Sequence, residues 1–359
     1  DQPRSRGLGD VYKRQLYYAP EIEQWAGVET MTDREIFAAA YNLSLMQEYA
    51  AGLGARFAFT IAPDKSSLYP EHLPGYPESD APSNAERLKT VLDELDVAYV
   101  DLFELFESQD EVLYFEHDSH WNSRGAALAA DAINSALGVS SNYGEGFDYE
   151  TSQHTGDLFE MLYPAGEDGE TNDEPTAMNF NQGENVRPDS ITIDTTGAGE
   201  LNLLMFRDSF GELLYPFMAE SSAAARFSRM AAYDLTLAEE LSSTAVVIEL
   251  VERNLSWLYE QAATYPAPER ELEFTAAQSG TATATFEEAY EDAHRVSGVI
   301  SGEMDVASPA YIEYNGVVYA AGLTSDGYTI CLPGEGGGEY TVLWYSNGVL
   351  TGCDISANI

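Results

Sequence analysis

Apolar residues recur at helical spacing in residues 33–51, and this pattern predicts the first long α-helix of the chain. The shared face carries Ile36, Phe37, Ala40, Leu43, Met46 and Tyr49. Thr32 and Glu35 have the spacing of a capping box, which satisfies free backbone N–H groups at a helix start. Gly52 and Gly54 follow the last turn, as is typical of a helix end.

Four short apolar runs predict buried β-strands, at residues 56–62, 97–102, 201–206 and 244–250. Helices are expected at residues 83–95, 123–137 and 254–263, and directly after Ser209. Unbroken apolar strands that alternate with helices are typical of a parallel sheet in an α/β fold. Ligands bind such sheets at the carboxyl ends of the strands, so polar residues that follow a strand are candidates for chemistry.

Two regions show other patterns. Residues 139–195 are acidic and weakly periodic, and we expect long loops there, apart from an ordered segment at 156–162. From residue 271 onward, short runs of β-forming residues alternate with glycine-containing turns such as Asn315-Gly316. This pattern predicts a small antiparallel, sandwich-like β-domain over residues 271–359, following an α/β domain over residues 16–264.

The charge of the chain narrows its range of partners. Among 359 residues, Lys and Arg together number 17, and the formal net charge is -44. Phosphate backbones are bound through basic side chains, so we expect no nucleic-acid partner. The chain has no continuous apolar run long enough to cross a membrane. The two cysteines, Cys331 and Cys353, could form a disulfide in an oxidising compartment or remain thiols.

Residues 1–15 differ from the rest of the chain. They have no hydrophobic periodicity, and residues 10–15 resemble a translated sequencing adapter of the kind left at the edge of a metagenomic contig. We exclude this segment from fold reasoning, as one would an expression scar. We therefore expect that the natural N-terminus is missing, with any signal peptide or membrane anchor, and that this start is no sign of a cytoplasmic protein.

The candidate chemistry lies in two stretches about ninety residues apart. Asp118 and His120 stand two positions apart, and Ser209 follows the apolar run 201–206 at a predicted strand-to-helix corner. A serine, a histidine that takes its proton and an acid that orients the histidine are the groups that acyl transfer needs. Amide N–H groups at the following helix start could stabilise an oxyanion. Taken singly, Asp208-Ser209 and Asp118 are also consistent with simple helix caps.

Other residues at predicted strand ends are candidates for substrate or oxyanion binding. Lys65 and Arg253 could hold an anionic or sugar ligand, although solvated side chains or ion pairs explain them somewhat more readily. Arg207 and Asp208 directly precede the serine. Trp121 is more readily explained by packing than by a sugar platform, and Asn122 by a helix cap.

The histidines on either side of Asp118 also allow a metal site, an interpretation that we do not favour. His117, Asp118 and His120 offer zinc-ligand chemistry, but neighbouring side chains diverge and no second cluster follows, so no metal or other cofactor is expected. His72, His154 and His294 are expected in loops or at the surface. Among these three, His154 has some chance of lining the cleft, because it precedes Gly156-Asp157.

Five blocks in order across residues 62–255 resemble one known family. Residues 114–126, YFEHDSHWNSRGA, are similar to the D-x-H-W-N-x-x-G-A signature of the DHHW/AlgX–AlgJ-like SGNH-hydrolase proteins. Residues 62–74, APDKSSLYPEHLP, resemble that family's P-x-K-x-x-x-Y-P-x-x-L-P block. Its later blocks resemble residues 156–158, 206–211 and 251–255. The predicted β-domain lies outside the resemblance.

This resemblance implies a three-layer α/β/α fold with Ser209 as nucleophile, His120 as general base and Asp118 as the acid that orients it. It implies O-acetyl transfer to, or ester hydrolysis on, extracellular polysaccharide, with an acetyl donor that a membrane acyltransferase could supply. The serine follows the Asp-x-His pair, an order that looks like the AlgX–AlgJ branch. Arg207 replaces the glycine of the usual Gly-Asp-Ser block and would narrow the cleft or pair with an acid.

We therefore predict an extracytoplasmic, serine-dependent O-acetyltransferase or acetylesterase. The alternative is a cell-envelope glycan-binding or scaffold protein with a decayed site, in which Ser209 and His120 would lie far apart. A metal-dependent hydrolase is the third hypothesis. The acidic surface disfavours a polyanionic substrate unless a local basic patch of Lys65, Arg207 and Arg253 compensates.

Overall fold

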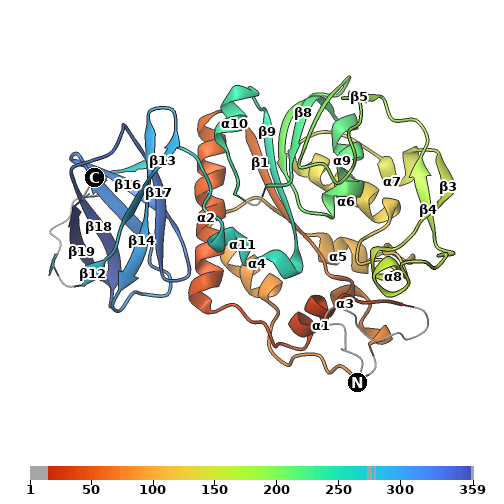
Figure 1. Cartoon of the computed structure of the whole chain (residues 1–359), viewed down its shortest axis with the longest axis horizontal. Helices are drawn as coiled ribbons and strands as arrows, with labels where there is room; N and C mark the ends of the chain where they lie inside the picture. Colours follow the sequence, from red (N-terminus) through yellow and green to blue (C-terminus); the bar gives the residue numbers. More distant parts are fainter. Residues whose placement is uncertain (1–14, 74, 231, 273–276, 279, 357–359) are drawn as a thin grey trace.

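The computed structural model describes residues 15–73, 75–230, 232–272, 277–278 and 280–356. The adapter-like residues 1–14 lie outside the described residues. Figure 1 shows an α/β part and a β-sheet part, with helix α2 (Asp33–Gly52) running between them.

The α/β part is built on a seven-stranded sheet. Its strands, in spatial order, are β2 (Tyr99–Val100), β1 (Arg56–Ala62), β9 (Ala245–Val251), β7 (Leu201–Phe206), β8 (Ser222–Ser228), β6 (Thr192–Gly197) and β5 (Phe180–Gln182). The strands from β2 to β8 are parallel to one another, whereas β6 and β5 continue the sheet in antiparallel fashion. The predicted parallel sheet is confirmed, and it carries an antiparallel edge.

Alternate residues of the central strands face two separate layers of helices. In β1, Phe57, Phe59 and Ile61 join the core beneath α2, while Ala58 and Ala62 join the core on the opposite face. The first layer holds α2, α4 (Asn84–Glu94), α10 (Thr236–Glu240) and α11 (Trp257–Glu260). The second holds α5 (Leu102–Glu107), α6 (Ser123–Ala136), α7 (Tyr143–Gly146) and α9 (Gly211–Glu220). The predicted three-layer α/β/α arrangement is confirmed (Figure 1).

Several elements differ from their predicted bounds for local reasons. The strand expected at 97–102 is limited to β2, because the Asp101 side chain accepts the N–H groups of Phe103 and Glu104 and so begins α5. The helix expected at 254–263 is divided into the 3₁₀ turn η2 (Glu252–Asn254) and the short α11. Strand β8 was not predicted, because its run of three alanines resembles a helix former.

The acidic region 139–195 also contains more order than predicted. Besides β5 and β6 it holds a ribbon of β3 (Tyr149–Gln153) and β4 (Thr171–Pro175), with α8 (Asp157–Leu162) between them. The prediction of long loops was wrong here, because β3 and β4 are mostly solvent-facing and lack an alternating apolar pattern. The expectation of order at 156–162 matches α8.

The C-terminal part is a ten-stranded sheet that curls around its own core. Its strands are β10 (Glu269–Arg270), β11 (Ala277–Gln278), β12 (Thr281–Ala282), β13 (Thr285–Tyr290), β14 (Ala293–Ser301), β15 (Ala310–Tyr314), β16 (Val317–Leu323), β17 (Gly327–Pro333), β18 (Glu339–Ser346) and β19 (Val349–Ser356). All pairings are antiparallel except that of β11 with β19. The predicted β-domain is confirmed, as one continuous, nearly closed sheet. Cys331 and Cys353 are both free thiols.

Helix α2 joins the two parts through a buried asparagine. The Asn42 side chain donates to the carbonyls of Leu258 and Leu323, both at 2.8 Å, and accepts the Leu323 N–H at 2.7 Å. Arg34, at the start of the helix, donates to the Ser308 carbonyl of the β-domain at 2.5 Å. These contacts hold the β-domain against the helix layer. Among the described helices, none is both long and apolar enough to cross a bilayer.

Candidate active site

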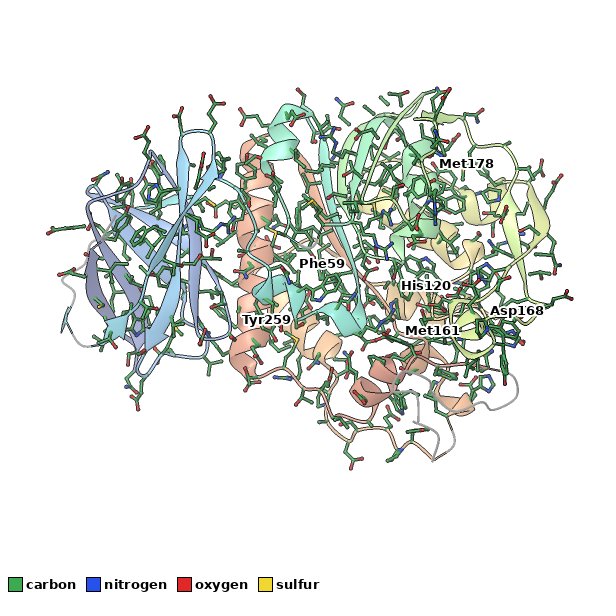
Figure 2. The ribbon with its side chains drawn as sticks, in the orientation of Figure 1. Phe59, His120, Met161, Asp168, Met178 and Tyr259 are labelled. Carbon is green, nitrogen blue, oxygen red and sulfur yellow. The ribbon has the colours of Figure 1, made fainter. Side chains whose placement is uncertain are left out.

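Ser209, His120 and Asp118 meet at the carboxyl edge of the large sheet. Oγ of Ser209 lies 2.8 Å from Nε2 of His120, and Nδ1 of the same imidazole lies 2.7 Å from Oδ1 of Asp118. The histidine side chain is 20% exposed, which leaves the serine–histidine pair open to a small substrate. Figure 2 labels His120 within the α/β part, on the side away from the β-domain.

Two local structures bring these residues together. Ser209 occupies the connection between the end of β7 and the start of α9, as the strand-to-helix prediction expected. Asp118 and His120 lie in a tight loop whose ends are joined by a β-bridge between Tyr114 and Trp121. The Asn122 N–H donates to the Leu113 carbonyl at 2.8 Å and closes this loop.

Each oxygen of the Asp118 carboxylate has two hydrogen-bond partners. Oδ1 accepts from the backbone N–H of His120 at 2.9 Å and faces the imidazole of the same residue at 2.7 Å. Oδ2 accepts the backbone N–H of Asp157 at 3.1 Å and lies 3.0 Å from Nε2 of His154. Asp118 therefore has partners on both sides although it is almost fully buried.

The electrostatics of the pair favour a charged aspartate next to a basic imidazole. Burial works to raise the pKa of Asp118, but hydrogen bonds from His120, His154 and Asp157 outweigh it and leave this pKa well below its usual range. Burial likewise works to lower the pKa of His120. The hydrogen bond and charge of Asp118, with the charge of Asp157, outweigh burial and raise the pKa of His120.

A second carboxylate, Asp157, borders the site. Its Oδ1 accepts the Ser119 N–H at 2.8 Å and its Oδ2 accepts the Ser119 hydroxyl at 2.7 Å. Oδ2 also lies 3.7 Å from Nδ1 of His120, so its charge adds to that of Asp118. Burial and the neighbouring charge of Asp118 raise the pKa of Asp157.

Lys65 does not lie where a substrate could reach it. The side chain is fully buried, and Nζ donates to the carbonyls of Leu16 and Asp118 at 2.7 and 2.9 Å and to that of Glu116 at 3.2 Å. The prediction of a substrate-binding lysine is therefore wrong. The three carbonyls occupy all the N–H donors of its ammonium group. Lys65 therefore links the loop that carries Asp118 and His120, the active-site loop, to the segment that leads into α1 (Ala19–Trp25).

The two arginines near the site are also engaged within the protein. Arg207 is buried and donates to the carbonyls of Pro188 and Ser190 at 2.6 and 3.0 Å. Its guanidinium therefore neither narrows the cleft nor pairs with an acid. Arg253 forms an ion pair with buried Asp64 and is 11% exposed. Neither arginine forms the compensating basic patch, because Arg207 is buried and Arg253 is paired with buried Asp64.

Three further candidates, predicted to bind the substrate or the oxyanion, instead make structural contacts within the protein. Asp208 is buried and accepts the Phe210 N–H at 2.9 Å. Trp121 is fully buried and donates from Nε1 to the Phe210 carbonyl at 3.0 Å, which excludes a role as an exposed platform. Asn122 caps α6 by accepting the N–H groups of the first turn, as its helix-cap interpretation expected. The Phe210 ring in turn lies 4.7 Å from the His120 ring.

The other histidines have varied surroundings. His117 does not join Asp118 and His120: its Nδ1 lies 2.7 Å from Asp168, and Glu170 accepts its backbone N–H. His294 was expected at the surface, but it is buried in the β-domain, where Nε2 lies 3.0 Å from the Tyr340 hydroxyl. Within the described residues, two acid–histidine groups have metal-ligand spacing, one of them in this site.

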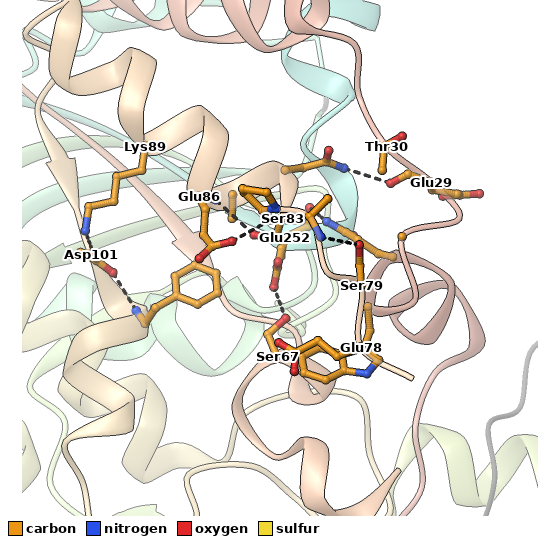
Figure 3. A pocket seen from close by; sticks show the side chains of 18 of the residues that line it. Glu29, Thr30, Ser67, Glu78, Ser79, Ser83, Glu86, Lys89, Asp101 and Glu252 are labelled. Carbon is orange, nitrogen blue, oxygen red and sulfur yellow. Dashed lines mark hydrogen bonds and ion pairs between the residues drawn. The ribbon is translucent and has the colours of Figure 1, made fainter. Parts of the chain in front are cut away.

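A cavity of about 370 Å³ opens at the same sheet edge, beyond η2. Figure 3 shows its carboxylates, among them Glu29, Glu78, Glu86 and Glu252, with one basic side chain, Lys89, paired with Asp101. Ser209 and His120 do not line it. Since neither residue lines it, this cavity is distinct from the serine–histidine pair.

The fold and site define the class as SGNH hydrolase-like. Residues 16–196 match a family model described as the SGNH hydrolase-like domain, acetyltransferase AlgX. The chain belongs to this family, as the sequence blocks predicted. The matched residues include Asp118 and His120 and end before Ser209. The family supports an enzyme with a general acetyltransferase role.

Solved structures share the fold at low sequence identity. PatB1 from Bacillus cereus has a TM-score of 0.55 at 17% identity, covering 69% of this chain and 96% of that one. The same protein with a sulfonyl adduct gives 0.53 at 18%, covering 69% and 95%. A DHHW family protein from Eubacterium siraeum gives 0.52 at 15%, covering 73% and 98%. No curated protein matches the chain.

Sequence reasoning undervalued two residues of the site. His154 was expected in a loop with some chance of lining the cleft, and Asp157 was not among the predicted site residues, yet both contact the Asp118 carboxylate. The block at residues 156–158 could have drawn attention to Asp157. For His154 the signal was its position directly before Gly156-Asp157, which predicted a chance of lining the cleft but not its contact with Asp118.

Proposed function

We propose that the protein is a serine-dependent O-acetyltransferase or acetylesterase that acts on extracytoplasmic polysaccharide through an acetyl-enzyme. The observation that carries this proposal is the chain of short contacts from Ser209 through His120 to Asp118. In this array the imidazole can take the serine proton at Nε2 while the carboxylate holds the Nδ1–H.

The first half-reaction transfers an acetyl group to the enzyme. Oγ of Ser209 attacks the acetyl carbonyl as its proton moves to Nε2 of His120. The bond from the carbonyl carbon to the leaving oxygen then breaks, and the leaving group takes the proton from the imidazolium. Asp118 stabilises the transient positive charge on the imidazolium and keeps its own negative charge.

The second half-reaction uses the same groups in reverse. A sugar hydroxyl or water gives its proton to Nε2 and attacks the acetyl carbon, and the bond to Oγ of Ser209 breaks as the proton returns to the serine. A sugar acceptor makes the enzyme a transferase, and water makes it an esterase. A membrane acyltransferase would be a suitable source of the acetyl group.

Amide groups at the start of α9 are the proposed oxyanion donors, because N–H groups of a first helical turn have no intrahelical acceptor. The Phe210 amide is excluded, since it already donates to Asp208. The amides of Ser209 and Gly211 are therefore the candidates. In other enzymes one such donor contributes about 3 kcal/mol to transition-state stabilisation.

The acceptor polymer should carry little negative charge. The formal charge of the chain is -44, and Lys65, Arg207 and Arg253 all donate to internal oxygens. A polyanionic glycan would meet repulsion without local compensation. A neutral or basic polysaccharide outside the cytoplasm is the substrate that these charges favour.

The test is hydrolysis of a chromogenic acetyl ester by the full chain, beside Ser209→Ala and His120→Ala. We expect activity in the parent and its loss in both variants, with unfolding curves that resemble the parent's. Activity that survives Ser209→Ala would remove Ser209 as the nucleophile. A folded but inactive parent would instead favour the decayed, glycan-binding alternative, which the 2.8 Å contact between Ser209 and His120 argues against.

A further inference from the structure

The side of Asp118 that faces away from His120 is held by a short segment, residues 154–157. We propose that His154 is a positioning residue, which fixes the Asp118 carboxylate so that His120 presents Nε2 to Ser209. This inference rests on the proposed function, and it assigns a role to a residue outside the serine–histidine–aspartate array.

The division of contacts between the two carboxylate oxygens is the first support. Oδ1 faces His120 at its ring and backbone nitrogens, whereas Oδ2 faces Nε2 of His154 at 3.0 Å and the N–H of Asp157 at 3.1 Å. A carboxylate bound on one side alone can rotate between acceptor positions. With donors on both sides, rotation would break several hydrogen bonds at once.

The ring of His154 is itself held in place. It stacks on Phe115 with ring centroids 3.9 Å apart and planes 9° apart. The backbone N–H of His154 donates to the Glu170 carbonyl at 3.0 Å. A ring fixed on its face and at its backbone can direct Nε2 to a single acceptor, which a mobile loop histidine could not do.

The segment approaches the active-site loop so closely that one position requires glycine. A Cβ at Gly156 would lie 2.2 Å from the carbonyl oxygen of His117 and 2.9 Å from the Asp118 nitrogen. Phe159, in α8, donates its N–H to the same His117 carbonyl at 3.1 Å. The contact of His154 with Asp118 therefore belongs to a packed junction between two backbones.

The charges around His154 suit a donor to a carboxylate. Asp118 faces it directly, and the charges of Glu170 and Asp168 also act on it; together these acids outweigh burial and raise its pKa. Either the neutral Nε2–H tautomer or the protonated ring can donate to Oδ2. The positioning contact therefore does not require His154 to be charged.

The test compares His154→Phe, which removes the donor, with His154→Gln, which offers a side-chain amide in its place. His72→Gln serves as a control at a histidine in the turn η1 (Pro70–His72). The probe is an aryl sulfonyl fluoride, with which Oγ of Ser209 forms a bond to sulfur while fluoride leaves and His120 takes the proton. We expect His154→Phe to react about 10- to 100-fold more slowly than the parent, and His154→Gln to recover most of the rate.

A second readout does not depend on enzyme activity. The proton between Nδ1 of His120 and Asp118 should give a strongly downfield NMR signal, also in a Ser209→Ala background. We expect the signal to shift or vanish in His154→Phe and to persist in His154→Gln and His72→Gln. An unchanged signal in folded His154→Phe would overturn the positioning role, whereas a parent that fails to react with the reagent would count against the proposed function alone.

Discussion

Asp208 joins the ends of two neighbouring strands: its Oδ2 accepts the backbone N–H of Val251 at 2.8 Å. The same oxygen accepts the side-chain amide of Asn254 at 3.0 Å, and Oδ1 accepts the Phe210 N–H at 2.9 Å. The carboxylate before Ser209 thus sets the corner between β7 and α9 against the end of β9. The Asp208 side chain therefore positions the backbone at Ser209 and does not bind the substrate.

Substitution of Asp208 should therefore cost both stability and activity. In Asp208→Ala, the buried N–H groups of Phe210 and Val251 lose their acceptors, which costs about 1–3 kcal/mol for each group. Asp208→Asn keeps one acceptor oxygen and should lie between the parent and the alanine variant. Urea unfolding measures the first effect and acetyl-ester hydrolysis the second; full stability in Asp208→Ala would contradict this role.

The pH dependence of acetyl-ester hydrolysis should reflect the raised pKa of His120. The neutral imidazole is the base, so kcat/KM should fall as the pH drops through this pKa, at a higher pH than the usual histidine value of about 6.5. Asp118→Asn removes the charge that raises this pKa, so its acid limb should move to lower pH while its maximum rate falls. An acid limb in the parent below the usual histidine range would be inconsistent with this electrostatic arrangement.

Lys65→Met should destabilise the protein strongly. The substitution leaves the carbonyls of Leu16, Glu116 and Asp118 without the ammonium donor, and hydrogen bonds from a charged group contribute about 1.5–3 kcal/mol each. Lys89→Met is the matched control, because Lys89 is 45% exposed and its pair with Asp101 should contribute about 1 kcal/mol or less. Similar losses in the two variants would refute the structural role of Lys65.

The stability of the protein should decrease from mildly acidic to basic pH. Burial, together with the charge of Asp64, raises the pKa of Glu252 to about 8, from a model-compound value of 4.5. Between these values the native state binds more protons than the unfolded state, so the free energy of unfolding falls as the pH rises through this window. Glu252→Gln should flatten part of this slope in thermal unfolding, and an unchanged slope would exclude Glu252 as a source. Glu21, whose pKa burial raises to about 7, should leave a residual slope.

Chelation should leave acetyl-ester hydrolysis unchanged. The carboxylate oxygens of Asp118 and Asp157 near His120 already accept protein N–H and O–H groups, so the array needs no cation to hold its shape. Parallel assays with a chelator and with added Zn²⁺ address this expectation. Loss of activity on chelation, with recovery on adding metal, would favour the metal-hydrolase hypothesis.

Local sequence was sufficient for the elements whose signals lie within a few residues. The capping box of Thr32 and Glu35, the buried run that becomes β1 and the glycine-punctuated β-domain are all predicted from nearest neighbours. The antiparallel edge strands β5 and β6 and the separate ribbon of β3 and β4 were harder to predict, because they carry polar residues on exposed faces. Their pairing depends on contacts between distant segments.

The sequence by itself determined the α/β class, the β-domain and the three residues of the proposed array, because periodicity and ordered motifs are properties of the chain. Only the tertiary structure decided which polar residues face inward. In it, the buried Lys65 ammonium group donates to three backbone carbonyls, and His154 contacts the Asp118 carboxylate. The reason is physical: a side chain's partners depend on where the backbone folds back on itself, and a buried polar group must find its partners there or raise the free energy of the fold.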